Sequence, residues 1–316
     1  MLTGLKRAVI ERLGINRVAR SADVTAAEVA ALRDEVASLR TQCASGAALV
    51  PAPATPADPQ TDIWRRVTLG SAVTATLVAP PVTISVVLAT RNRADLLQRA
   101  LRSLFAQTHA AWQLVVVDDG STDDTPDVLA AIDDARVLRL RTEGVGAAGA
   151  RNAALAHATG EWVAFLDDDN VMDAGWLHAV AVFAARTPDA QAVFGAQLRQ
   201  HEADPALSVS DAYVLFADPV DPAGLTFLNT IDLGALAVRR GAAELHFDDT
   251  LPRFIDWDLV CRLAAVHHLH ALPVWTGVYT TDAAQRITGK GGSEAIDAFR
   301  RRLTDPDDPA GKPAHR

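Results

Sequence analysis

From residue 82 onward, apolar positions recur in two alternating patterns, which predict a mainly parallel sheet flanked by helices. Continuous runs of valine, isoleucine and leucine are typical of strands that are buried on both faces. Between these runs, apolar residues recur every three or four positions, as on the buried side of a helix. Four strands and three helices alternate, so we expect an α/β fold. The predicted strands are VTISVVLA, WQLVVVDD, ARVLRLRT and EWVAFLDDD, and the predicted helices are ADLLQRALRSLFAQ, TPDVLAAIDD and AAGARNAALAHAT.

The pattern is less regular in the later part of the chain. A further strand is expected over residues 193–198. LGALAVRR, RFIDWDLVCRLAAVHH and ALPVWTGVY then predict a strand, a helix and a strand. Residues 289–316 are polar and become proline-rich, and they predict a flexible C-terminal tail.

The segment before the sheet divides into two parts. Residues 1–42 predict a helical N-terminal extension, because leucine and valine recur there at helical spacing among basic residues. Two roles for it stay open: a basic helix that rests on an anionic membrane surface, or a helix that packs on its own domain or on a second copy. Residues 43–80 are interpreted as an Ala/Pro-rich linker and lead-in, whose residues 67–78 favour a pair of strands.

Composition limits the classes of function. The chain has 316 residues, of which 49% are hydrophobic and 22% charged, as in ordinary globular proteins. Its net charge of -9 argues against a broad attraction to nucleic acid. Cys43 and Cys261 lack zinc-site spacing and indicate a reducing compartment. No apolar run reaches the ~20 residues of a membrane span. We therefore expect a cytoplasmic protein, with any membrane contact peripheral, at the inner face and through residues 1–42.

Two predicted strands end in acidic residues, Asp118–Asp119 and Asp167–Asp169. Because the carboxyl ends of parallel strands meet at one edge of a sheet, we expect these acids to lie together. Consecutive carboxylates after an apolar strand require a positive charge nearby. Their hard oxygen atoms suit Mg²⁺ or Mn²⁺, ions that usually take one or two carboxylates plus water and phosphate oxygens. Helix capping by Asp169 would explain one acid and leave the others unexplained.

The sequence EGVGAAGARN places Gly144, Gly146 and Gly149 at the spacing of a dinucleotide-binding fingerprint. A predicted strand precedes it, a helix follows it, and Asp168 lies about 20 residues further on, as the fingerprint requires. However, the fingerprint normally occupies the first βα turn of its fold, and here two βα units come before it. A glycine-rich turn that presents Arg151 to the acidic edge also fits. A Rossmann-type NAD-dependent oxidoreductase stays open at this point.

Four segments occur in the order ISVVLATRNRADLLQRALRSLFAQT, QLVVVDDGSTDDT, GVGAAGARNAALAHATGEWVAFLDDDN and FIDWDLVCRLA. Taken together and in this order, they resemble the family 2 inverting glycosyltransferases, which have the GT-A fold. The resemblance covers roughly residues 82–279 and implies a GT-A domain over 81–288. Within that domain, residues 81–200 would form the nucleotide-sugar-binding half and 201–288 the acceptor-binding half.

The resemblance implies roles at the nucleotide. Thr90 and Arg91 follow the first strand, in the loop that lines the nucleotide pocket of the family. Asp119 matches the acid that binds the nucleotide base, and Arg151 matches the basic residue that faces the nucleotide. Asp119 suits the imide N–H of uracil, thymine or guanine, with UDP preferred.

The resemblance also implies a D-x-D-like element at Asp167–Asp169. Asp168 matches the ribose contact and Asp169 the ligand of a divalent metal, Mn²⁺ or Mg²⁺. Asp167 shares one of these two roles.

Asp256, in FIDWDLV, matches the general base of the family. Many relatives carry a glutamate just before this aspartate, whereas this chain has Ile255. Asn229 and Asp232 lie in a stretch that resembles the frame of the acceptor site. Trp257 is either a core residue or a stacking platform for a sugar, and its place in a helical apolar pattern favours the core.

The expected function is therefore the metal-dependent, inverting transfer of a hexose-like sugar in the synthesis of a bacterial glycan or metabolite. The donor would be a nucleoside-diphosphate sugar and the acceptor a hydroxyl group. Two other functions stay open. One is the oxidoreductase, and the other is a non-catalytic sugar-nucleotide-binding protein that associates through residues 1–42.

Overall fold

The computed structural model describes residues 59–200, 213–216, 220–280 and 293–304. The predicted extension 1–42 and the linker up to residue 58 lie outside the described residues. The elements in chain order are α3 (Pro59–Thr74), β1 (Ile84–Thr90), α4 (Ala94–Phe105), β2 (Trp112–Asp119), α5 (Thr125–Ala130), β3 (Val137–Thr142), α6 (Gly146–Leu155), β4 (Trp162–Phe165), β5 (Val171–Met172), α7 (Trp176–Arg186), β6 (Ala192–Gln200), β7 (Tyr213–Leu215), α8 (Pro222–Leu225), the short 3-10 helix η2 (Leu233–Ala235), β8 (Leu236–Arg239), α9 (Ile255–Val266), β9 (Leu269–Thr280) and α10 (Ser293–Thr304).

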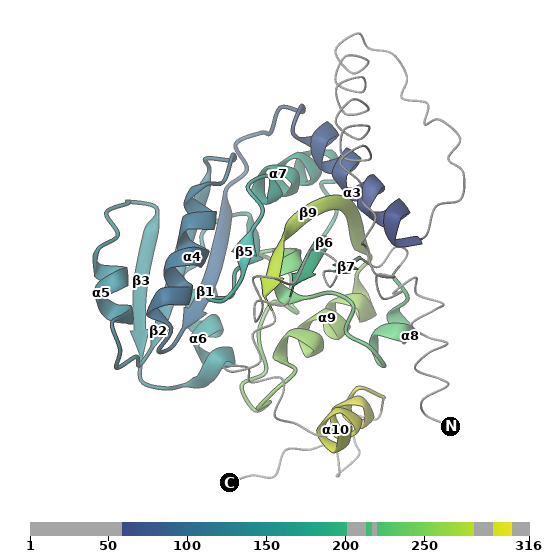
Figure 1. Ribbon diagram of the computed structural model, residues 1–316. Coiled ribbons are helices and arrows are strands. Elements are labelled where there is room, and N and C mark those ends of the chain that lie inside the picture. Colours follow the sequence, from purple (N-terminus) through teal and green to yellow (C-terminus); the bar gives the residue numbers. More distant parts are fainter. Residues whose placement is uncertain (1–58, 201–212, 217–219, 281–292, 305–316) are drawn as a thin grey trace.

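One mixed sheet runs through the described residues in the order β3-β2-β1-β4-β8-β6-β9-β5, with β7 paired to β6 (Figure 1). The four predicted strands β1 to β4 are parallel to one another, as the sequence pattern indicates. Strand β8 runs antiparallel to β4, and β9 runs parallel to β6. The chain passes from β1 outward to β2 and β3 and then returns to the other side of β1 as β4. The sheet therefore has a switch point between β1 and β4, where open α/β sheets bind ligands.

The central strands β1, β2 and β4 are buried on both faces, which explains why they show no polar alternation, whereas the edge strand β3 alternates and exposes Arg139 and Arg141. Successive residues of β1, such as Val86 and Val87, belong to different apolar clusters. One cluster includes Leu101 of α4 and Val180 of α7, and the other includes Ala150 of α6. The period-2 geometry of a strand sends successive side chains into these two layers.

Residues 59–74 form helix α3, so the predicted strand pair at 67–78 is wrong. The helix packs on β9 by a face that includes Trp64 and Val67, and the Trp64 ring centroid lies 4.7 Å from that of Trp275. The Ser71 hydroxyl also accepts a hydrogen bond of 2.9 Å from the Trp275 amide. Valine and threonine in this segment suggested strands, but burial against β9 decides its conformation, because β propensity is weak compared with packing.

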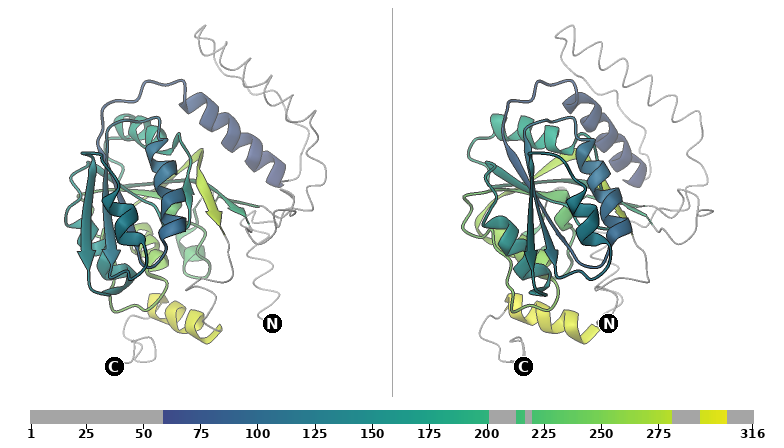
Figure 2. Two further views of the ribbon diagram at one scale, coloured as in Figure 1. Left: turned by 60° about the vertical axis from the view of Figure 1, so that its left-hand side comes forward. Right: turned by 90° about the vertical axis from the view of Figure 1, so that its left-hand side faces the viewer.

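Residues 293–304, which we expected in the flexible tail, form helix α10. Phe299 is buried there, with its ring centroid 5.2 Å from that of Phe254 and 5.1 Å from that of Trp257 in α9. This apolar contact docks a helix that also carries several charged residues, among them Arg300 to Arg302. Helices α3 and α10 lie at opposite ends of the molecule (Figure 2).

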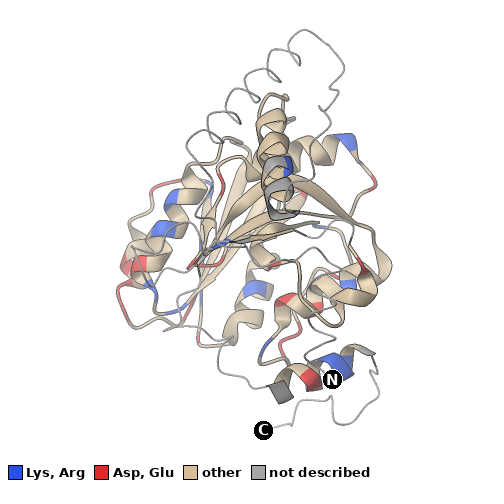
Figure 3. Ribbon diagram, turned by 45° about the vertical axis from the view of Figure 1, so that its right-hand side comes forward, with Lys and Arg blue, Asp and Glu red and all other residues tan. Residues whose placement is uncertain are grey.

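None of the described helices combines the length and the apolar character that a membrane span requires. Basic and acidic positions are interspersed over the described helices and loops (Figure 3). Attraction to an anionic ligand must therefore come from arginine side chains that gather locally.

Candidate active site

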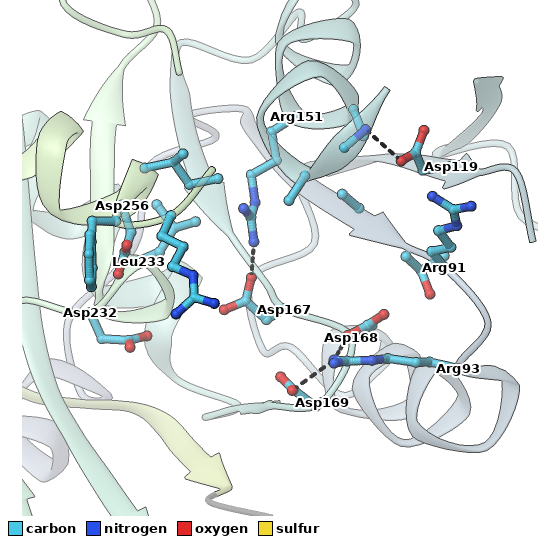
Figure 4. A pocket seen from close by; sticks show the side chains of 18 of the residues that line it. Arg91, Arg93, Asp119, Arg151, Asp167, Asp168, Asp169, Asp232, Leu233 and Asp256 are labelled. Carbon is cyan, nitrogen blue, oxygen red and sulfur yellow. Dashed lines mark hydrogen bonds and ion pairs between the residues drawn. The ribbon is translucent and has the colours of Figure 1, made fainter. Parts of the chain in front are cut away.

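A cleft of about 430 Å³ opens at the carboxyl ends of β1 and β4, at the switch point of the sheet (Figure 4). Most of the residues expected at the site line this one cleft. They are Thr90, Arg91, Asp119, Arg151, Asp167, Asp168, Asp169, Asp232 and Asp256. Residues from the first and the later part of the chain thus meet at one edge of the sheet.

At one end of the cleft, Asp119 holds the glycine-rich turn in place. One carboxylate oxygen, Oδ1, accepts from the Thr142 hydroxyl at 2.7 Å and from the Val145 amide at 2.8 Å, and the other accepts from the Gly146 amide at 2.8 Å. Burial opposes the charge on this carboxylate, but these hydrogen bonds and the nearby charge of Arg91 lower the pKa of Asp119 below its usual range. Asp119 is therefore a fixed anion at this end of the cleft.

This arrangement bears on the dinucleotide interpretation of the glycines. Gly144 and Gly146 adopt positive φ angles of 77° and 82°, which glycine tolerates best. The turn leads into α6, but the amides of Val145 and Gly146 point at Asp119. In a dinucleotide fingerprint, the first amides of the helix would face a pyrophosphate. The turn also follows the edge strand β3, not the switch point. Neither observation favours the oxidoreductase.

The loop between β1 and α4 carries two cleft arginines, Arg91 and Arg93. Between them Asn92 has a left-handed backbone, with φ at 54°. Its amide donates to the Ser121 hydroxyl at 2.9 Å, and its side-chain oxygen accepts from the Thr122 amide at 2.7 Å. The loop after β2 thus clamps the loop after β1, and both arginines reach the cleft.

Arg93 neutralises part of the acidic cluster, a role that we did not predict. Its Nη1 atom donates to Asp168 Oδ1 at 2.8 Å and to Asp169 Oδ2 at 2.9 Å. Arg91, two positions earlier, is the residue that the family resemblance selected. The sequence TRNRAD contains a second basic residue at i+2, which was the available signal.

Arg151 pairs with the remaining acid of the cluster. Its Nη2 atom lies 2.6 Å from Asp167 Oδ1. The neighbouring residue on α6, Asn152, exchanges hydrogen bonds of 2.7 and 2.8 Å with the backbone of Phe247, and the guanidinium of Arg151 lies over that ring. Arg151 thus faces the acidic edge, as expected from the glycine-rich turn.

The acidic cluster carries more negative charge than its arginines balance. Burial raises the pKa of Asp169 to about 6; the charges of Asp167 and Asp168 act in the same direction, and Arg93 opposes them. Burial also raises the pKa of Asp168. A raised pKa means that the surroundings disfavour the ionised carboxylate, so that binding of a proton or of a cation is favourable there.

The carboxylate oxygen atoms of this cluster suit a hard divalent cation, but they supply only some of the ligands that such a cation needs. Asp169 keeps 28% of its side chain exposed and lines the cleft, so one carboxylate is accessible. In the described parts of the chain, no three His, Cys, Asp or Glu side chains converge on one point. A cation here would therefore need water and phosphate oxygens as further ligands, which is the usual arrangement for Mg²⁺.

Asp256 lies at the other end of the cleft, in the first turn of α9. Burial raises its pKa to about 6, and the negative charge of Asp232 acts in the same direction. The Asn229 side-chain amide donates to Asp256 Oδ2 at 3.2 Å. A partly buried carboxylate with this pKa can accept a proton near neutral pH.

The two aspartates of the sequence IDWDL face different surroundings. Asp256 lines the cleft, whereas Asp258 is buried and pairs with Arg262 at 2.8 Å. This agrees with the expectation that residues at i and i+2 of a helix do not share a face.

The acceptor candidates occupy three different environments. Asp232 lines the cleft, but its carboxylate also accepts from Gln197 at 3.1 Å and from Arg199 at 3.2 Å. Asn229 contacts Asp256 without lining the cleft. Trp257 is a core residue, because its ring packs on Phe299 and its indole N–H donates to a backbone carbonyl. The alternative of a sugar platform at Trp257 is not supported.

Comparison with known proteins finds a sequence family that is similar to the part of the chain that contains Thr90 to Asp169. Residues 85–220 match the model described as glycosyl transferase family 2. A segment of 91 residues is 44% identical to an uncharacterized glycosyltransferase of Nostoc, covering 28% of each chain. A segment of 88 residues is 39% identical to the Escherichia coli UDP-Glc:alpha-D-GlcNAc-diphosphoundecaprenol beta-1,3-glucosyltransferase WfaP, covering 28% of this chain and 35% of WfaP. The match thus spans about a third of the length of these relatives.

Solved structures share the fold. The crystal structure of S. aureus TarS 1-349 in complex with UDP-GlcNAc superposes with a TM-score of 0.55 at 21% identity, over 70% of this chain and 65% of that one. The sheet order and the flanking helices are therefore those of a GT-A-like fold, as the sequence resemblance implied.

Proposed function

We propose that the chain, whose residues 85–220 match the model of glycosyl transferase family 2, transfers a sugar from a nucleoside diphosphate to a hydroxyl group, with inversion at the sugar carbon. One observation carries the proposal: an accessible acidic cluster and a carboxylate suited to accept a proton, Asp169 and Asp256, line the same cleft. The cluster that contains Asp169 can bind the cation that neutralises the leaving diphosphate, and Asp256 can accept the proton of the attacking hydroxyl.

The nucleotide would bind at the end of the cleft that contains Asp119 and Arg91. A carboxylate offers about four acceptor positions, and three of those on Asp119 are used by the turn. One position is left for the imide N–H of a base, for which we propose uracil. TarS, whose structure holds UDP-GlcNAc, has the same fold. Thr90 and Asp168 would contact the ribose, and Arg91 lies where it can meet the base or its phosphates.

The diphosphate would lie over the acidic cluster. A divalent cation, Mn²⁺ or Mg²⁺, held by Asp169 would supply charge neutralisation for the departing diphosphate. Arg151 is fixed beside Asp167 and can donate to a phosphate oxygen while it keeps that ion pair. Arg93 opposes the rise in the pKa of Asp168 and Asp169 that burial causes, and it holds one oxygen atom of each carboxylate.

Asp256 would remove the proton of the attacking hydroxyl. Its pKa of about 6 lies close enough to neutrality for a general base, a role that typically contributes roughly 10²–10⁴-fold to the rate. The Asn229 amide orients the carboxylate through Oδ2. Attack from the side opposite to the diphosphate inverts the configuration at the sugar carbon.

The acceptor is proposed by analogy with relatives. WfaP is named for a sugar linked to diphosphoundecaprenol, and a second relative is a putative teichuronic acid biosynthesis glycosyltransferase of Bacillus subtilis, 40% identical over 90 residues. We propose a glycan intermediate as the acceptor, with the protein working in the cytoplasm at the inner membrane face.

Calorimetric titration tests the proposal. The full chain is titrated with UDP, GDP, dTDP and NAD, each with Mn²⁺ and again with EDTA, for the wild type and Asp169→Ala. We expect UDP to bind with Mn²⁺ and to lose most of its affinity in Asp169→Ala. Metal-independent binding of NAD without binding of any diphosphate would contradict the proposal. Sugar-nucleotide binding without release of UDP from any UDP-sugar would favour a non-catalytic protein.

A further inference from the structure

We propose that Arg253 binds an anionic group of the acceptor, a phosphate or carboxylate that lies close to the hydroxyl that is glycosylated. The inference rests on the proposed function and adds to it a chemical class of acceptor. Arg253 lines the cleft and stands three positions before Asp256 in the sequence.

The Arg253 side chain is half-buried, and one of its nitrogen atoms lacks a protein partner. The Nη1 atom is buried, and among the residues that the structure describes nothing accepts a hydrogen bond from it. A buried donor without a partner costs stability, so it calls for an explanation. A ligand that brings its own acceptor oxygen atoms into the cleft would provide one.

The nearby acids already have partners. Arg93 pairs with Asp168 and Asp169, and Arg151 pairs with Asp167. Within the described residues, no ion pair joins Arg253 to any of the acids that line the cleft. Its positive charge is therefore available for a substrate, although the cleft as a whole is acidic.

The backbone next to Arg253 is held in a conformation that is rare for its residue type. Phe254 has a φ angle of 61°, in the left-handed region that bulky residues seldom adopt. Its ring packs against Trp257 and against Phe299 of α10. Helix α10 thus supports the turn that precedes α9. Strain of this kind persists where the surrounding structure fixes it, often at functional sites.

The position of Arg253 along the cleft indicates that it contacts the acceptor and not the donor. Figure 4 shows Asp232 and Asp256 at one end of the cleft, Asp119 and Arg91 at the other, and Arg151 between them. Arg253 belongs to the segment of Asp256, the proposed base, and so to the acceptor end. A guanidinium at that place can bind a phosphate or carboxylate through two parallel hydrogen bonds, an interaction that a neutral sugar cannot offer.

The test uses small sugars as acceptor probes. Binding of glucose 1-phosphate, glucuronate and neutral methyl glucoside to the full chain is measured by saturation-transfer NMR, with saturating UDP and Mn²⁺ and again without nucleotide. The variants are Arg253→Gln, Arg253→Lys and the control Arg186→Gln, which removes an exposed arginine of α7 outside the cleft. We expect Arg253→Gln to weaken one or both charged probes about 10-fold or more. The neutral probe, the UDP affinity and the control should not change, and Arg253→Lys should retain part of the affinity.

A second measurement separates a binding role from a structural one. Because Nη1 has no described partner, Arg253→Gln should leave the melting temperature unchanged or raise it. A variant that melts earlier and binds all probes more weakly would assign Arg253 to the fold and overturn the proposal. Loss of UDP affinity with unchanged probe binding would also overturn it, because the anion would then be the donor diphosphate. If the wild type binds no nucleotide, the proposed function fails, while the titrations without nucleotide still decide the role of Arg253.

Discussion

Arg93 and Asp169 form an ion pair of 2.9 Å, and the same nitrogen atom of Arg93 reaches Asp168 at 2.8 Å. One guanidinium nitrogen, which carries two N–H donors, thus serves two neighbouring carboxylates of the cluster in which we propose a divalent cation. The protein carries an internal positive charge where a metal would act, and the two should partly substitute for each other.

Replacing Arg93 should therefore make the fold depend more on metal. In EDTA at pH 8, we expect Arg93→Gln to lose roughly 1–3 kcal/mol of unfolding free energy, below the roughly 3–5 kcal/mol of a fully buried pair, because these side chains keep partial exposure. Mn²⁺ should raise the melting temperature of the variant more than that of the wild type. Equal Mn²⁺ effects in the two proteins would contradict this prediction, and Arg186→Gln is the control.

Replacing the proposed base should separate catalysis from binding. Asp256→Asn should lower the turnover of a UDP-sugar roughly 10²–10⁴-fold while it leaves Mn²⁺-dependent UDP binding intact. It should also raise the melting temperature at pH 7, because burial disfavours the charge on Asp256. The matched variant Asp258→Asn should show the reverse, a lower melting temperature from the broken Arg262 pair with near-normal turnover. A large loss of turnover in Asp258→Asn would argue that the two roles are exchanged.

The pH dependence has a defined sign. The pKa of Asp256 is raised from 3.8 to about 6, so its contribution to stability is fully present below pH 3.8 and is lost as the pH rises through about 6. Activity should instead rise with pH, because Asp256 can accept a proton only when it is ionised. We expect kcat/KM to fall about tenfold per pH unit below pH 6, with a further loss from protonation of Asp169. A rate that is flat from pH 5 to pH 8 would exclude Asp256 as the base.

A glycine in α3 should be intolerant of a single methyl group. A Cβ atom on Gly70 would lie 1.9 Å from the Pro273 carbonyl oxygen, whereas a Cβ atom on Gly241 meets nothing within 4 Å. In an open helix, Gly→Ala stabilises by roughly 0.5–1 kcal/mol. We expect Gly70→Ala instead to destabilise by roughly 1–3 kcal/mol, through overpacking against β9. Chemical denaturation of Gly70→Ala and Gly241→Ala measures the difference, and similar midpoints would mean that α3 does not dock closely.

The sequence predicts the first half of the fold well and the packed periphery poorly. Strands β1, β2 and β4 were recognisable because burial on both faces produces continuous apolar runs. Helix α3 was not, because the residues that fix it lie on β9: Gly70 packs against Pro273, about 200 positions later. Helix α10 likewise packs through Phe299, which contacts residues about 40 positions earlier, in a segment that carries several charges.

The acids of the site were predictable, whereas several of their partners were not. Carboxylates that directly follow parallel strands must reach the same edge, so Asp119 and Asp169 could be placed from the strand pattern. An arginine side chain is long enough to reach several places, and the sequence does not say which one. Arg93 and Arg253 line the cleft, and each stands next to a residue with a left-handed backbone, Asn92 and Phe254, a conformation that the apolar pattern does not predict.

The docking of α3 on β9 also has a practical consequence. The segment that matches the family begins at residue 85, but Trp64 and Val67 cover part of β9 from outside that boundary. A recombinant fragment started at the family boundary would expose Trp275 and the apolar surface around it to water. Such a fragment should aggregate during purification, so expression should begin before Pro59.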